Sequence, residues 1–261
     1  AMSEKYLGKT FDIHGGGMDL VFPHHEAEIA QSNACNDCNP VNYWMHNNMI
    51  TVDGKKMGKS LGNFINLEEF FNGTHEKLER AYTPMTIRFF ILQAHYRSTV
   101  DFSNEALQAA EKGFNKLMNA LETLQTLSAT DTSTYDVKKL EENCYMAMDD
   151  DFNTPILIAH LFDGVRIINS VKDGKESLNL TDLEKLKSIF NIFVTDILGL
   201  ISAKESRGND LTSEVMELVL QLRGNAKKSK DFGTADLIRD ELNKAGIQIK
   251  DSREGTSWEV K

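Results

Sequence analysis

The chain has 261 residues, of which 41% are hydrophobic and 26% charged, and its formal net charge is −10. This length predicts about two domains with room for a small third. No apolar run reaches the roughly 18 residues of a membrane helix, and Ala1–Tyr6 lacks the apolar segment of a secretory signal. Three cysteines suit a reducing compartment, so we expect a cytoplasmic protein without membrane association.

The first 60 residues have the order strand, helix, strand that indicates an α/β fold. The glycines Gly15–Gly17 follow the first strand and allow steep turns and close approach of the backbone to a ligand. Asp53-Gly54 predicts a further turn. The predicted elements are a strand at Phe11–His14, a helix from Pro23 to Gln31, and extended segments at Val41–His46 and Met49–Val52.

From about residue 84 the apolar spacing becomes helical, because hydrophobic residues recur every three or four positions. Thr181 and Glu184 predict a capping box before the last of these stretches. Short polar loops between amphipathic helices favour an antiparallel bundle. The four stripes are Leu107–Leu124, Val137–Met148, Leu157–Ile168 and Leu183–Leu200.

Beyond the bundle, the polar segment Lys204–Asp210 is the predicted linker to a small third domain. This domain should hold a helix with the stripe Val215, Leu218 and Leu222, then a helix from Phe232 closed by Gly246, and a two-stranded ribbon. Most of the negative charge, −7 of the −10, falls in residues 101–204. Nucleic acid therefore remains a possible partner at either end of the chain.

Three lysines lie among glycines in the segment Lys55–Asn63. Clustered ammonium groups on a mobile loop can neutralise the charge that develops on a polyphosphate during group transfer. Taken alone, the same lysines also fit a solvated basic turn.

His24 and Glu28 are four residues apart, so on a continuous helix they share one face and can provide half of a zinc site. On an ordinary surface helix the same pair can arise by chance. Cys35-x-x-Cys38 has the spacing of a zinc knuckle. A complete zinc site formed by these two thiolates together with His24 and Glu28 is therefore an alternative. Cys144 lies on an apolar stripe and is predicted to be a core residue.

His14, Gly15–Gly17 and Asp19 lie at the end of the first strand, where α/β sheets bind ligands. Asp19 could accept hydrogen bonds from a ribose. A purely structural glycine turn is the alternative.

Several segments, in this order, resemble cysteinyl-tRNA synthetases, and the resemblance extends over essentially the whole chain. Lys56–Ser60 (KMGKS) is similar to the lysine signature of class I aminoacyl-tRNA synthetases, usually written KMSKS, with Gly58 at the place of its serine. The other segments are Phe11–Ser32 (FDIHGGGMDLVFPHHEAEIAQS), Asn42–His46, Leu61–Asn63, Ala147–Pro155 (AMDDDFNTP), Gly246–Asp251 and Gly255–Trp258.

The resemblance implies a ligase that joins cysteine to its tRNA through a cysteinyl-adenylate, with ATP and Mg as the nucleotide substrate. It implies that Lys59 contacts ATP, that Lys56 stabilises the departing pyrophosphate, and that Asp19 and Gly15, Gly16 and Gly17 lie along the adenosine. His24 and Glu28 correspond to two of four ligands of a zinc that binds the substrate thiolate. The positions expected to read the anticodon are Lys227, Phe232, Asp236 and Asp251.

No His-x-Gly-His sequence occurs in the chain, and neither Cys35 nor Cys38 falls at a ligand position of the family. The resemblance therefore implies an N-terminally truncated, monomeric fragment that is inactive alone. It would comprise a remnant of the Rossmann-like catalytic domain (1–50), a linker and stem-contact segment with the lysine loop (51–83), a helical bundle (84–203) and a small helix-rich α+β anticodon-binding domain (204–261). A cysteine ligase acting on a small-molecule amine and a non-catalytic RNA- or zinc-binding module are the alternatives.

Overall fold

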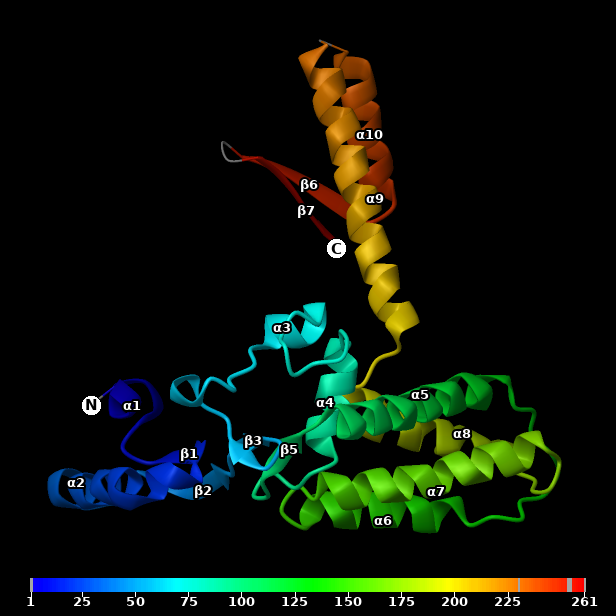
Figure 1. Cartoon of the computed structure of the whole chain (residues 1–261). Coiled ribbons are helices and arrows are strands. Elements are labelled where there is room, and N and C mark those ends of the chain that lie inside the picture. Colours follow the sequence, from blue (N-terminus) through cyan, green and yellow to red (C-terminus); the bar gives the residue numbers. More distant parts are fainter. Residues whose placement is uncertain (1, 230, 253–254, 261) are drawn as a thin grey trace. The chain divides into compact units, whose positions relative to one another are not determined.

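A computed structural model of the chain describes residues 2–229, 231–252 and 255–260. These residues form two compact units, one ending at Ile201 and the other beginning at Ser202 (Figure 1). The division into four domains predicted above is finer than this and stays a prediction. Within the described residues, no helix is both long and apolar enough to cross a membrane.

The first unit begins with helix α1 (Met2–Leu7) and a parallel strand pair, β1 (Phe11–Gly17) and β2 (Val41–Asn47), linked by helix α2 (Glu26–Asn36). Between β1 and α2 lie the helical turns Met18–Leu20 and Val21–His25. The predicted strand–helix–strand order is confirmed; Phe22 is extended, and Pro23–His25 form the turn that leads directly into α2.

The glycines Gly15–Gly17 belong to strand β1 and do not form the predicted turn. They pair with Met45–Asn47 of β2 in the parallel ladder. Close approach explains the glycine at the central position, because a Cβ on Gly16 would lie 2.6 Å from Cε1 of His25. Glycine at this position lets the imidazole of His25 approach the strand backbone, whereas any larger residue would clash with it.

A second small sheet carries the lysine segment. Strand β3 (Ile50–Val52) pairs antiparallel with β4 (Lys55–Lys56) and parallel with β5 (Val100–Phe102). The predicted turn at Asp53-Gly54 is confirmed, with φ of 53° and 72°, the left-handed values of a tight hairpin turn. After a helical turn at Lys59–Leu61, helix α3 (Leu67–Asn72) leads into the bundle region.

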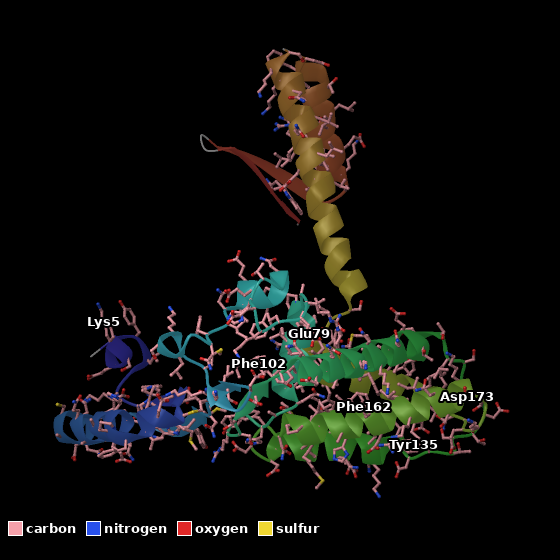
Figure 2. The ribbon with its side chains drawn as sticks, viewed as in Figure 1. Lys5, Glu79, Phe102, Tyr135, Phe162 and Asp173 are labelled. Atoms are coloured by element: carbon pink, nitrogen blue, oxygen red, sulfur yellow. The ribbon has the colours of Figure 1, made fainter. Side chains whose placement is uncertain are left out.

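The predicted bundle is present as a layer of long helices packed side by side (Figure 1). Figure 2 labels Phe162 in the middle of α7 and Asp173 directly after its end. The helices are α4 (Pro84–Leu92), α5 (Asn104–Thr126), α6 (Val137–Asp149), α7 (Thr154–Lys172), and α8 (Leu180–Phe190) with its π-helical continuation Asn191–Ile197. Helix α8 is capped by Asn179, whose side chain accepts from the N–H of Asp182, so the capping box predicted at Thr181 is wrong.

The hydrophobic core lies almost entirely in this bundle and in the sheet against it. One cluster of buried side chains runs from Val52 through Phe102 to Leu200. Within residues 2–48, all of which the structure describes, only Val41 and His25 are buried. The α/β segment therefore depends on its strand pairing more than on an apolar core of its own.

The second unit consists of α9 (Ala203–Lys228), α10 (Phe232–Lys244) and an antiparallel ribbon, β6 (Ile247–Ser252) with β7 (Gly255–Val260). Both helices, the left-handed Gly246 and the ribbon agree with the sequence prediction. Lys204–Asp210 is wrong as a linker, because α9 already includes it.

The apolar stripe predicted for α9 does not form its buried face. Val215, Leu218 and Leu222 are more than half exposed, whereas Met216 and Arg223 are buried. The Arg223 Nε–H donates to the carbonyl of Ala235 on α10 at 3.4 Å. The face of α9 that carries Arg223 packs against α10. The apolar repeat of Val215, Leu218 and Leu222 therefore predicts the helix correctly but not its contact face.

Candidate functional site

The lysine loop, residues 55–63, is held at its base by one buried amide. Asn63 is 6% exposed; its Nδ2 donates to the carbonyl of Lys56, and its Oδ1 accepts from the N–H of Gly58, each at 3.0 Å. Met57 N–H also donates to the carbonyl of Ile50 at 3.1 Å. The loop is therefore a supported projection of β4 and not a free basic turn.

The two lysines of the signature remain accessible on this support. Lys56 and Lys59 are both exposed, and the Lys59 ammonium lies 5.4 Å from the ring centroid of Phe64. Gly58 continues the loop in an extended conformation. The arrangement leaves two cations free to approach an anionic ligand while the chain between them is anchored.

A group of imidazoles and a carboxylate meets where β1 faces α2. The ligand atoms of His14, His25 and Glu28 lie within 4.8 Å of one another. His14 Nδ1 is buried, has no hydrogen-bond partner, and lies 3.3 Å from Oε2 of Glu28. Two imidazole nitrogens and a carboxylate oxygen form a donor set that suits zinc, and the unsatisfied nitrogen is the atom that a metal would take up.

Two further aromatic side chains from β2 complete this group. The Trp44 ring stacks on His14 with centroids 4.7 Å apart, and the Nδ1 atom of His25 lies 2.8 Å from Nε2 of His46. Burial is the main cause that lowers the pKa of His25, and the nearby imidazole of His14 lowers it further. The neutral form, which is the form that binds metals, is therefore favoured at His25.

Of the predicted metal pair, the structure brings Glu28 into this group but not His24. His24 is exposed and lies in the helical turn Val21–His25 before α2, where only Phe22 departs from helical backbone angles. The pair His24 and Glu28 stays a prediction. Cys35 and Cys38 join no three-ligand group among the described residues; Cys38 Sγ instead accepts from the Thr10 hydroxyl at 3.6 Å.

The remaining predicted residues lie in two places. Asp19 follows β1 in an exposed helical turn, beside the glycines. In the second unit, Lys227 and Phe232 flank the tight connection between α9 and α10, where the N–H of Asp231 donates to the carbonyl of Ala226. Phe232 is 62% exposed. Asp236 follows on the same face of α10 and pairs with Arg239 at 3.3 Å, and the side chain of Asp251 lies outside the described residues.

Sequence reasoning missed the participation of His25, His46 and Asn63 in these sites. His25 was adjacent to a candidate and Asn63 stood within the quoted motif, but neither has a spacing that reveals its role. The ring partners of His25 come from strands β1 and β2, whereas the partners of Asn63 lie earlier in the same loop.

Comparison with known proteins agrees with this geometry. A family profile described as the tRNA synthetases class I (C) catalytic domain matches residues 1–112, and a DALR domain matches residues 143–202. The LeuRS of Agrobacterium radiobacter K84, solved as a LeuRS–tRNA–LeuAMS ternary complex, is similar in fold. It has a TM-score of 0.50 and 17% identity, over 69% of this chain and 25% of that one.

Curated relatives of this chain carry the name cysteine–tRNA ligase. The protein of Parabacteroides distasonis is 57% identical over all of this chain and 53% of its own length. The one from Phocaeicola vulgatus is 58% identical over all of this chain and 54% of its own length. The one from Chlorobium luteolum is 46% identical over 99% of this chain and 53% of its own length.

The parallel strand pair, the lysine loop and the two domain matches define part of a class I aminoacyl-tRNA synthetase. Within that class, the chain belongs to the cysteine–tRNA ligase family. It spans about half the length of the curated relatives it matches.

Proposed function

We propose that the chain provides part of a cysteine–tRNA ligase, which attaches cysteine to its tRNA through a cysteinyl-adenylate formed from ATP. The observation that carries this proposal is the identity of 46–58% to ligases of that name along the whole chain. The alternatives of a small-molecule cysteine ligase and a non-catalytic module receive no comparable support from these relatives.

Lys59 and Lys56 act on the triphosphate in this proposal. Lys59 contacts ATP, and Lys56 stabilises the pyrophosphate as it leaves with its bound Mg. Their exposure on an anchored loop supports this role, because a fixed cation stabilises the developing charge more than a freely moving one does. Gly15, Gly16, Gly17 and Asp19 lie along the adenosine in the same proposal.

The donor set around Glu28 would hold a zinc ion, with His24 as the ligand implied by the family motif and His14 and His25 close by. When bound, zinc would supply a Lewis acid that binds the thiolate of cysteine more strongly than the hydroxyl of serine. Trp44 stacks on His14 and His46 contacts His25, so both side chains restrict how the two imidazoles can move.

The second unit would bind the tRNA anticodon through Lys227, Phe232, Asp236 and Asp251. An exposed aromatic ring can stack on an unpaired base, and carboxylates accept from base amino groups. The exposure of Phe232 and its position next to the turn after Lys227 support this assignment. We propose a monomeric, cytoplasmic enzyme.

The test is cysteine-dependent ATP–pyrophosphate exchange. We expect none from these 261 residues alone, because the sequence holds no His-x-Gly-His motif and the described residues bring only two imidazoles and one carboxylate together in a group that could hold a metal. Fusion to the remaining part of the Parabacteroides distasonis ligase should give exchange that Lys59→Ala abolishes. A fusion that never shows cysteine-dependent exchange would overturn the function, and exchange by the chain alone would overturn its predicted inactivity.

A further inference from the structure

The motif Ala147–Pro155 belongs to the family resemblance but has no role in the function proposed above. In the structure it forms the connection between α6 and α7, where Asp151 and Phe152 both adopt left-handed backbone angles, with φ of 54° and 55°. Two consecutive non-glycine residues in this region are costly and persist only where the surroundings hold them. The conformation aims the Asp151 carboxylate away from the bundle, towards the segment after α4.

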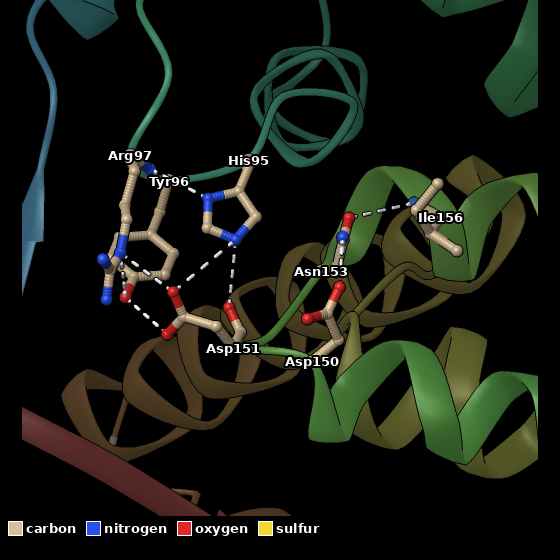
Figure 3. Close-up of polar contacts among 7 residues, drawn as sticks. All are labelled: His95, Tyr96, Arg97, Asp150, Asp151, Asn153 and Ile156. Atoms are coloured by element: carbon tan, nitrogen blue, oxygen red, sulfur yellow. Dashed lines mark hydrogen bonds and ion pairs between the residues drawn. The ribbon is translucent and has the colours of Figure 1, made fainter.

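Asp151 makes the central contacts of this connection (Figure 3). Its Oδ1 accepts from the Tyr96 hydroxyl at 2.7 Å, and its Oδ2 lies 2.8 Å from Nε of Arg97. Its backbone carbonyl lies 3.2 Å from Nε2 of His95. One residue thus engages three consecutive side chains, 95–97, which we call the clasped segment.

The clasped segment in turn holds the start of strand β3. The carbonyl of Tyr96 accepts from the N–H of Asn48 at 2.9 Å, and the carbonyl of Arg97 accepts from Nδ2 of Asn48 at 3.0 Å. Strand β5 then follows and pairs with β3 along its length. The backbone that enters β3 is therefore fixed from the side by residues that Asp151 holds.

Strand β3 is the base from which the lysine loop projects. Thr51 pairs with Lys56 across the hairpin. On the β5 side, Oδ1 of Asp101 accepts from the hydroxyl of Thr51 at 2.6 Å and from the N–H of Gly54 at 2.8 Å. A continuous series of hydrogen bonds thus leads from the α6–α7 connection to the strand that carries Lys56.

We propose that Asp151 is a positioning residue for the lysine loop: by clasping Tyr96 and Arg97 it fixes β3, and through β3 the orientation of Lys56 and Lys59. The catalytic part of this inference rests on the proposed function. Asp151 lies in the region matched by the DALR domain, and its partners lie in the region matched by the catalytic domain. The clasp therefore joins the two matched regions at the point where the loop is supported.

The clasp is tested on this chain by hydrogen exchange resolved to peptides. Asp151→Asn removes the charge but tolerates the left-handed backbone, and Tyr96→Phe removes only the hydroxyl. Each variant should make amides of residues 48–63 exchange roughly tenfold faster, the factor expected for about one charge-assisted hydrogen bond. Because Asp151 and Tyr96 belong to one hydrogen-bonded cluster with Arg97, the acceleration in the double variant should be smaller than the product of the two single accelerations.

Two matched controls keep this test specific. Asp149→Asn and Tyr145→Phe alter the same residue types on α6, where neither side chain makes a hydrogen bond or ion pair within the described residues. Both should leave residues 48–63 unchanged. Unchanged exchange of 48–63 in Asp151→Asn, or an equal acceleration throughout α5–α8, would overturn the proposal.

The catalytic consequence is measured in the fusion described above. Asp151→Asn should lower kcat of ATP–pyrophosphate exchange about tenfold while KM for cysteine stays within twofold, because the lysines act on the triphosphate. Faster loop exchange with unchanged kcat would overturn the positioning role. If the wild-type fusion shows no cysteine-dependent exchange, the proposed function fails, and the hydrogen-exchange result still decides whether the clasp supports the loop.

Discussion

Replacing Asn63 by alanine tests whether one amide supports the lysine loop. The change removes the donor to the Lys56 carbonyl and the acceptor of the Gly58 N–H, two bonds of 3.0 Å. Each hydrogen bond contributes about 0.5–1.5 kcal/mol net. Since the freed backbone groups lie on an exposed loop, water can replace part of this, and we expect a local loss of about 1.5 kcal/mol.

This loss corresponds to about a tenfold increase in the fraction of open loop. The assay is amide hydrogen exchange of peptides that cover residues 55–63, which should accelerate by that factor. The thermal midpoint of the bundle should move little, because Asn63 lies outside α4–α8. In the fusion enzyme, pyrophosphate exchange should decrease in parallel.

Asn115→Ala is the matched control, because Asn115 is an exposed residue of α5. It should leave the exchange of residues 55–63 unaltered. If Asn63→Ala also leaves it unaltered, the loop is held by other contacts and the reasoning is refuted.

Four further predictions concern other parts of the chain. Gly164→Ala should destabilise the bundle by about 1–3 kcal/mol in chemical unfolding, because its Cβ would lie 2.8 Å from a buried phenylalanine ring of α8; an unchanged midpoint would contradict this packing. Burial raises the pKa of Cys144 to about 12, so a thiol reagent at neutral pH should label exposed Cys35 and spare Cys144 until the chain unfolds. Phe232→Ala should weaken binding of an anticodon stem-loop by about 1–3 kcal/mol in a titration without changing the fold, and equal affinity would remove Phe232 from the interface. Because the folded state lowers the pKa of His25, stability in metal-free buffer should be highest above about pH 6.5 and decrease as the pH falls. The urea midpoint of unfolding should depend less on pH in His25→Gln than in the wild type.

The sequence predicted the bundle well because the signal was local and repeated. Each stripe, such as Leu107–Leu124, indicates both the helix and its buried face when one face packs against several neighbours. The same reasoning failed for the buried face of α9, where packing against a single helix buries Arg223 and leaves Leu218 exposed. A periodic apolar pattern predicts the presence of a helix more reliably than it predicts which face of that helix is buried.

The site was predicted less completely, because its geometry depends on contacts between distant strands. Local propensity favours a turn for a glycine triplet, and only the close approach of His25 to Gly16 in the folded chain explains its place in a strand. The i,i+4 rule selected His24 with Glu28, whereas the ligand atoms that lie close to Glu28 are those of His25 and of His14 on strand β1. Strand β5 was missed because it has three residues and pairs with a strand 50 positions earlier.

The uneven distribution of the core has a consequence for ligand binding. His14, His25 and Glu28 lie in the segment that buries almost no apolar side chains of its own. Segments of this kind open at a lower free energy than the helices of a well-packed core. A ligand that binds only the closed arrangement therefore shifts the opening equilibrium of residues 2–48 as well as occupying a site. Its measured affinity will contain the free energy of ordering this segment, and its presence will be visible as protection of β1 and α2 from exchange.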